Sequence, residues 1–272
     1  MSLTPPDVDD IELSLLLEGV QRRYGHELRH WDPTLVRARV GHLIETGGFS
    51  SISALQERVL RDDQWFEKLI DGIWSQPGRG MFGDPAFWRT LRWKIIPMLR
   101  TWPTVRAWVA GCATGADAWS LAVLFEEEGL SRRGVIHATD LDESLLKTAR
   151  AGQATGEQVA SWETNHRMSG GLGSLGAFFE GGELAARARD RIAYSRHVPG
   201  IEPSFNEFQL ILFRNPFVWT DGAARQRVGA LLRDSQVTFG FLCLDDAETL
   251  NRLPHGVWEI IDRKLAIARR VA

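Results

Sequence analysis

The stretch VRAWVAGCATG, residues 105–115, decides the fold. Its first half is an apolar run that predicts a buried strand, and Gly111 ends the run. A helical pattern follows over residues 116–129, and GVIHATD, residues 134–140, predicts a second strand. The next segment is again helical and closes at Gly152. Strands that alternate with helices predict a mostly parallel sheet covered on both faces, which is an α/β fold.

The alternation continues toward the C-terminus. Two further strands are predicted at FQLILFRN, residues 208–215, and at VTFGFLCL, residues 237–244, with a helix between them. The closing stretch VWEIIDRKLAIARRV suggests two final strands. Residues 153–190 fit the alternation poorly and are dense in glycine. They therefore form either a flexible loop or an inserted subdomain with tight turns.

Residues 1–75 show helical patterns only, which favours a small helical bundle. The predicted helix starts are Asp9 with Glu12 as a capping box, Asp32 before Pro33, Ser51, and Asp62 or Asp63. The stretch SQPGRGMFGDP that follows is rich in proline and glycine, as linkers are. The predicted organisation is a helical domain over 1–75, a linker over 76–86 and an α/β domain over 87–272.

Composition and charge exclude several classes of protein. The 272 residues carry 32 Lys and Arg against 35 Asp and Glu, so no basic field indicates a nucleic-acid partner. Two cysteines cannot build a disulfide framework, which favours a reducing, cytoplasmic location. The N-terminus MSLTPPDVDD is unlike a signal peptide, and no apolar run approaches the roughly 20 residues of a membrane span. The seven histidines show no metal-ligand spacing, so no metal is predicted.

The residues that close the first two predicted strands are the best candidates for a binding site. In open parallel sheets, ligands bind beyond the carboxyl ends of the strands. AGCATG, residues 110–115, is small enough for backbone to approach a ligand, and it leads into a helix N-terminus with unbonded N–H groups. The second strand ends at Asp140, 25 residues after Gly115. A carboxylate there can accept hydrogen bonds from two ribose hydroxyls.

This pattern favours a nucleoside-containing cofactor that has no pyrophosphate. It is not the Gly-x-Gly-x-x-Gly of dinucleotide enzymes, and no Lys-Ser/Thr follows as in a phosphate loop. S-adenosylmethionine fits this description. Plainer interpretations stand beside it, because glycine-containing turns also occur without a cofactor. Asp142 suits a helix N-cap, and Cys112 a small packed residue, while Trp219 past a strand end suits packing or a lid as well as ligand contact.

Several segments in one order resemble a known family. They are MFGDPAFW, AGCATGADAWSLA, ATDLDESLLKTARAG, FFEGG, RIAYSRHV and FQLILFRNPFVW. Together they are similar to the chemoreceptor glutamate methyltransferases of the CheR type. The resemblance implies an N-terminal helical domain, a class I Rossmann-like methyltransferase domain, and a small β-subdomain inserted over 152–190. It also implies methyl transfer from S-adenosylmethionine to glutamates of a chemoreceptor-like or other signalling protein. In some members the β-subdomain docks a receptor tail by strand addition.

The resemblance also implies roles for single residues. Gly111, Ala113 and Gly115 would shape the methionine pocket, and Asp117 would stand near the cofactor. Asp140 would hold the ribose, with Leu141 beside the adenine. The family's Arg-Asn pair at the end of the fourth strand corresponds to Arg214 and Asn215.

The chain departs from the family at positions close to the chemistry. Gly83 stands where the family has an arginine, and Trp219 where it has a tyrosine. Arg79 lies four residues before Gly83, so Arg79 and Trp219 are the candidate catalytic residues. Two hypotheses follow: a protein-carboxyl methyltransferase with a divergent site, or a catalytically impaired binding protein that holds S-adenosylmethionine or S-adenosylhomocysteine. A weaker third is an amino-group methyltransferase of nucleic acid, suggested by NPF at 215–217 and disfavoured by the net charge of −3.

Overall fold

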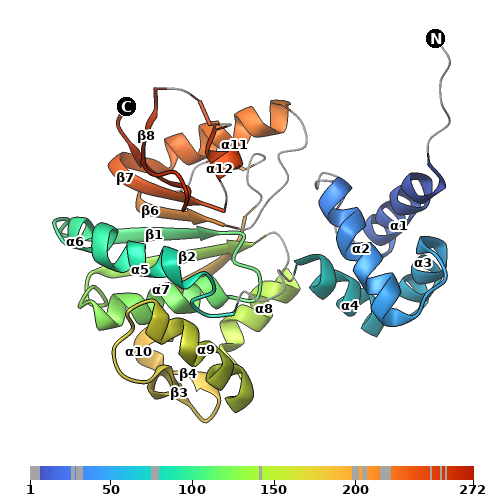
Figure 1. The fold of residues 1–272 in the computed structure, drawn as a ribbon, viewed down its shortest axis with the longest axis horizontal. Coiled ribbons are helices and arrows are strands. Elements are labelled where there is room, and N and C mark those ends of the chain that lie inside the picture. Colours follow the sequence, from blue (N-terminus) through green and yellow to red (C-terminus); the bar gives the residue numbers. More distant parts are fainter. Residues whose placement is uncertain are drawn as a thin grey trace. The chain divides into compact units, whose positions relative to one another are not determined.

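The computed structural model divides the chain into a helical unit and an α/β unit, which hold the described residues of 7–74 and those from 80 onward. Figure 1 shows the elements of each. The described residues are 7–25, 28, 33–74, 80–140, 143–197, 202–203, 207–214, 222–245, 247–251, 253–254 and 256–272.

The helical unit contains the helices that the sequence predicts. They are α1 (Val8–Tyr24), α2 (Pro33–Gly47), α3 (Ile52–Arg61) and α4 (Asp63–Trp74). Ser51 caps α3 as predicted, because its side chain accepts a hydrogen bond from the Ala54 N–H. The predicted capping box of Asp9 is wrong: the N-cap is Asp7, and α1 begins one residue later. Asp9 lies inside the first turn, where its carboxylate pairs with Arg37.

The α/β unit is built on a seven-stranded sheet in the order β5-β2-β1-β6-β7-β9-β8 (Figure 1). The pairs from β5 to β7 are parallel, and β9 pairs antiparallel with both β7 and β8. The predicted α/β fold class is therefore confirmed. The strands are β1 (Val105–Ala110), β2 (Gly134–Asp140), β5 (Ile192–Arg196), β6 (Phe208–Phe213), β7 (Gln236–Leu244), β8 (Trp258–Asp262) and β9 (Ile267–Arg270).

The strand order reverses direction at β1. The chain runs from β1 outward to β2 and β5, then returns to the other side of β1 with β6 and continues to β7. Such a reversal leaves a crevice beyond the carboxyl ends of the two strands that flank it, and ligands of open α/β sheets bind there. The residues that follow β1 and β6 therefore border this switch point.

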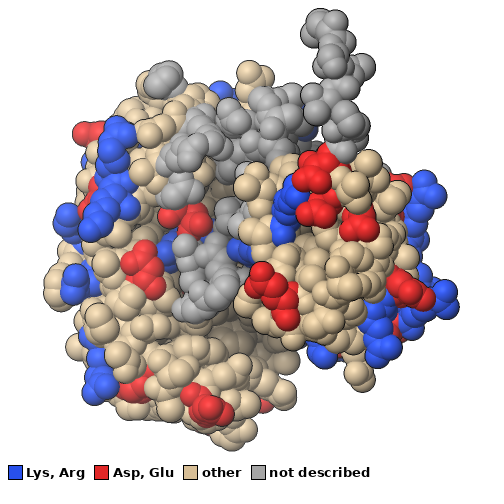
Figure 2. Space-filling model, turned by 45° about the vertical axis from the view of Figure 1, so that its right-hand side comes forward, with Lys and Arg blue, Asp and Glu red and all other residues tan. Residues whose placement is uncertain are grey.

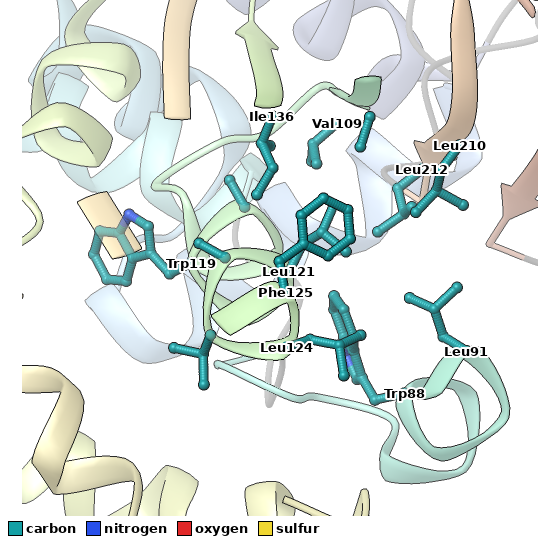
Figure 3. Close-up of a cluster of buried hydrophobic side chains, with 14 of the residues drawn as sticks. Trp88, Leu91, Val109, Trp119, Leu121, Leu124, Phe125, Ile136, Leu210 and Leu212 are labelled. Atoms are coloured by element: carbon teal, nitrogen blue, oxygen red, sulfur yellow. The ribbon is translucent and has the colours of Figure 1, made fainter. Parts of the chain in front are cut away.

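Helices connect and cover the strands. Before β1 the chain forms α5 (Pro85–Thr90), the π-helical turn η1 (Leu91–Ile95) and α6 (Ile96–Leu99). The crossover helices are α7 (Ala116–Glu127), α8 (Glu143–Ala151) and α11 (Gly222–Asp234), and the short α12 is Ala247–Asn251. Figure 3 shows Leu121 and Phe125 of α7 between apolar strand residues on one side and Trp88 and Leu91 on the other. These side chains are fully buried, so α7 is the centre of the core.

The predicted linker contributes to this core. Met81 and Phe82 are fully buried in the same cluster as Trp88. Phe82 has φ of 55°, which a bulky side chain seldom adopts, and its N–H donates to Ser120 Oγ at 2.8 Å. Burial and this hydrogen bond over-determine the conformation and hold it in place.

The glycine-dense stretch folds into small elements between α8 and β5. They are α9 (Gly156–Met168), the 3-10 turn η2 (Leu175–Phe178), the hairpin strands β3 (Phe179–Glu180) and β4 (Glu183–Leu184), and α10 (Ala186–Arg189). Figure 1 shows the hairpin beside α9 and α10. The hairpin turns at Gly181 and Gly182, both with positive φ. This stretch is therefore folded with tight turns that use glycines, and it is not one long loop.

A buried ionic network lies at the C-terminal end of α7. Arg92, in the π-helical turn, donates to Glu127 at 2.5 Å and to Glu128 at 2.7 Å. Glu127 also accepts from the Leu172 N–H at 2.8 Å and lies 2.8 Å from His166 Nε2. Burial raises the pKa of Glu127, but the hydrogen bonds from His166 and Arg92 outweigh it and hold that pKa below its ordinary value.

The lowered pKa of Glu127 predicts a stability loss in acid. A carboxylate whose folded-state pKa lies below its unfolded value stabilises the fold above the unfolded pKa of about 4.3. That stability is lost as the pH falls through the folded-state pKa. We expect the free energy of unfolding, measured by denaturant titration from pH 7 to pH 3, to fall less steeply below pH 4.5 in Glu127→Gln than in wild type. Parallel curves for the two proteins would contradict this.

Candidate functional site

The turn after β1 has an unusual backbone. Gly111, Ala113 and Gly115 all have positive φ, of 66°, 47° and 98°. Alanine seldom adopts such a value, and Ala113 is held there by a hydrogen bond described below. At Gly115 a Cβ would lie 2.8 Å from Trp119 Nε1, so only glycine fits. Gly115 is also the N-cap of α7 and offers no side-chain cap to its first N–H groups.

Asp140 connects the two strand ends that the sequence singles out. It is the last residue of β2, and its Oδ2 accepts a hydrogen bond from the Ala113 N–H at 2.8 Å. The side chain is almost fully buried at the sheet edge. Backbone bonds from Cys112 N–H to Thr139 O and from His197 N–H to Asp140 O fix the same corner. The carboxylate therefore lies against the β1–α7 turn, as a shared binding site requires.

Hydrogen-bonded side chains of α7 and β5 lie next to this turn. Trp119 Nε1 donates to Tyr194 Oη at 3.0 Å and to Ala149 O at 3.2 Å. Burial raises the pKa of Tyr194 well above its ordinary value. Burial, with the nearby Asp140 charge, likewise raises the pKa of Cys112 far above the usual thiol value. Cys112 therefore stays a neutral thiol, which agrees with the prediction of a small packed residue.

Arg214 borders the switch point from the other side, directly after β6. Its side chain is 2% exposed, and its guanidinium lies 3.8 Å from the centre of the Phe87 ring. Nη2 donates to Asp84 Oδ2 at 3.2 Å. Sequence reasoning picked out Arg214 and missed Asp84. The Asp-Pro pair at 84–85 was the available signal, since that pair is typical of a helix start.

The other predicted site residues divide into two groups. Asp117 lies half-buried in the first turn of α7, next to the positive-φ turn. Arg79, Leu141, Asn215 and Trp219 lie outside the described residues, and so does Asp142. The roles given to them from the sequence stay predictions.

The described surface carries both basic and acidic side chains (Figure 2). On the face drawn in Figure 2, basic side chains alternate with acidic ones, and no broad basic surface gathers among the described residues there. Within the described ranges, no group of three or more His, Cys, Asp or Glu side chains is arranged to hold a metal ion. None of the described helices combines the length and apolar character needed to cross a bilayer.

Comparison with known proteins matches both units. The CheR methyltransferase SAM-binding domain matches residues 80–262, and the CheR methyltransferase all-alpha domain matches residues 11–73. "Putative methyltransferase Cher3" of Pseudomonas putida is 31% identical over 246 residues, which cover 89% of this chain and 90% of that protein. A chemotaxis protein methyltransferase of Listeria innocua is 24% identical over 244 residues, covering 88% and 90%.

Among solved structures, this chain is similar to a TehB-like SAM-dependent methyltransferase from Corynebacterium glutamicum. The two are 11% identical with a TM-score of 0.38, over 79% of this chain and 96% of that one. The family match over residues 80–262 defines an S-adenosylmethionine-dependent methyltransferase. With both domain models matched in order, the chain belongs to the CheR methyltransferase family.

The residues present suit S-adenosylmethionine. Three residues of the turn over 111–115 have positive φ, and a Cβ at Gly115 would collide with the Trp119 ring, so the turn keeps its backbone free of side chains at this position. Its glycines let a ligand approach the backbone, and the start of α7 offers N–H donors to a carboxylate such as that of methionine. Asp140 stands at the strand end where ribose hydroxyls would need an acceptor. Backbone N–H donors and one carboxylate acceptor thus match the carboxylate and the ribose hydroxyls of a nucleoside linked to an amino acid.

Proposed function

We propose that this chain transfers the methyl group of S-adenosylmethionine to carboxylate side chains of a chemoreceptor-like or other signalling protein, in the cytoplasm. S-adenosylhomocysteine is the second product. The observation that supports this most is the joint presence of the helical domain and the SAM-binding domain of one family, in the family's order. The fixed Asp140 corner beside the β1–α7 turn supplies the geometry.

Methyl transfer to a carboxylate does not require the protein to remove a proton from the acceptor. With a pKa of about 4.3, a glutamate is already ionised at neutral pH, so no general base is needed. When bound, S-adenosylmethionine would supply a methyl group carried on a sulfonium, whose C–S bond would break as the new C–O bond forms, with no proton released. The protein's task is alignment of the acceptor oxygen and control of charge as anion and cation neutralise each other.

In the proposed site, each part of this task is assigned to particular residues. The turn over 111–115 and the start of α7, with Asp117, hold the methionine end. Asp140 takes the ribose and Leu141 borders the adenine. Arg214 and Asn215 close the site from the β6 side. Arg79 and Trp219 remain the candidates for contact with the reacting groups.

The defining test pairs two measurements on the full chain. Calorimetry with S-adenosylhomocysteine measures binding, and transfer of tritiated methyl groups to receptor cytoplasmic fragments measures activity. We expect binding together with base-labile label on the fragments, because methyl esters hydrolyse in alkali. Tight binding without transfer to any carboxylate would eliminate this proposal in favour of the cofactor-holding partner protein.

A double variant, Gly83→Arg with Trp219→Tyr, is expected to raise methyl transfer. Each family-type side chain adds a polar donor, and one preorganised donor is worth roughly 3 kcal/mol, or about a hundredfold in rate. Gly83 lies outside the left-handed region, so an arginine there adds no backbone strain. The control is Gly83→Met with Trp219→Phe, which changes bulk without adding donors. Equal rates for the two double variants would remove support for the catalytic interpretation of these positions.

A further inference from the structure

We propose that Asp84 is a positioning residue, which holds the Arg214 guanidinium at the switch point in the orientation that the cofactor site uses. This inference rests on the proposed placement of Arg214 at the cofactor. The two residues are distant in the sequence and meet only through the fold, where Nη2 of Arg214 donates to Oδ2 of Asp84 at 3.2 Å.

Asp84 itself is held firmly. Its backbone lies in the left-handed region with φ of 62°, which aspartate and asparagine tolerate better than other residues with a side chain. Its Oδ1 accepts from the Phe87 N–H at 3.3 Å and so caps α5. The carbonyl of Gly83, the residue directly before Asp84, accepts a hydrogen bond from Trp88 Nε1 at 3.1 Å. One carboxylate oxygen thus fixes a helix start, and the other is left aimed at Arg214.

Arg214 is restrained on two sides. The central carbon of its guanidinium lies over the Phe87 ring, 3.8 Å from the ring centre, and Phe87 is itself buried. Asp84 takes one of the guanidinium's five N–H donors along its edge. A face contact alone leaves rotation in the ring plane open, whereas a bond to one edge nitrogen stops it. Asp84 is 40% exposed while Arg214 is 2% exposed, so the carboxylate lies on the open side of the pair.

Asp84→Asn separates the two jobs of this carboxylate. Asparagine keeps the shape, the left-handed backbone and the cap on Phe87, because its carbonyl oxygen can still accept that bond. Its amide N–H groups then face the Arg214 donors, so the bond to the guanidinium is lost. We expect the dissociation constant for S-adenosylhomocysteine to rise about tenfold, as expected when a charge-assisted hydrogen bond stops orienting a ligand contact.

The control is a variant that weakens the same unit elsewhere. Glu127→Gln disrupts the ionic network at the far end of α7 and is expected to bind S-adenosylhomocysteine as wild type does. All proteins are measured well below their melting temperatures, where a calorimetric stoichiometry near one shows that the folded fraction is complete. Loss of affinity in Glu127→Gln as large as that in Asp84→Asn would overturn the inference, because destabilisation alone would then explain both.

A double variant shows whether Asp84 acts through Arg214. Arg214→Lys keeps the positive charge but loses the planar fork, so it is expected to weaken binding by itself. Adding Asp84→Asn to it should cause no further loss. A further tenfold loss, or wild-type affinity in Asp84→Asn alone, overturns the inference. Because these measurements need no methyl acceptor, they stand even if transfer to carboxylates fails, and the two failures are distinguishable.

Discussion

Asp140→Ala is expected to weaken the binding of S-adenosylmethionine by about 2–4 kcal/mol, which is roughly a 30- to 700-fold rise in the dissociation constant. Two losses add up in this variant. The proposed acceptor for the ribose hydroxyls disappears, and so does the acceptor for the Ala113 N–H at 2.8 Å. Ala113 has φ of 47°, so its turn then loses the bond that offsets the strain of this conformation. Calorimetry on the full chain measures the effect.

Asp140→Asn distinguishes the two losses. Its amide oxygen can still accept from Ala113, so the turn keeps its anchor while the charge and one acceptor are removed. We expect an intermediate loss of about 1–2 kcal/mol for this variant. Wild-type affinity in Asp140→Asn with a loss in Asp140→Ala would show that Asp140 only braces the turn and does not touch the ribose. Wild-type affinity in both variants would contradict both proposed contributions to binding.

Arg92→Met is expected to lower the free energy of unfolding by about 3–5 kcal/mol. Methionine fills much of the same space but leaves Glu127, whose side chain is 3% exposed, without its guanidinium partner. Breaking a buried pair from one side is costly because a desolvated charge remains. For a unit of this size the melting temperature should fall by roughly 6–20 °C. Denaturant and thermal unfolding of the full chain measure both quantities.

Arg100→Met is the matched control for Arg92→Met. Arg100 pairs with Glu128 at 2.6 Å, yet its side chain is 43% exposed, so its loss should cost under about 1 kcal/mol. A cost below 1 kcal/mol for Arg92→Met as well would mean that the network contributes little beyond what water supplies to these carboxylates.

The sequence predicts strands and turns best where local chemistry is unambiguous. β2 has the predicted bounds because an apolar run ends at a single acidic residue, and the β1 turn follows from its glycines. The start of α1 was misplaced by two residues because three nearby aspartates all suit a cap. Local patterns cannot choose among them. In the structure the Asp7 side chain accepts a hydrogen bond from the Asp9 N–H, while Arg37 pairs with all three carboxylates.

Contacts between distant segments escaped prediction for a different reason. Arg92 lies in a segment that reads as an ordinary helix, where an arginine is expected to be solvated. Its burial depends on Glu127 at the end of α7, on the C-cap Glu128 and on the π-helical turn, none of which leaves a sequence pattern. The sequence likewise predicts only a helix cap at Asp84. Its hydrogen bond with Arg214 forms because the fold brings the two residues together. The site residues on single turns were foreseeable, and their partners were not.

The burial of Met81 and Phe82 decides where the methyltransferase unit can be cut free. A fragment that starts at residue 87, the boundary suggested by composition, would leave two holes in the core cluster around Trp88. It would also strip Ser120 of the N–H donor it binds. Met81 and Phe82 are buried, so proteases that cleave exposed chain would not reach them. A recombinant fragment of the α/β unit must therefore begin at or before Met81 in order to keep a filled core.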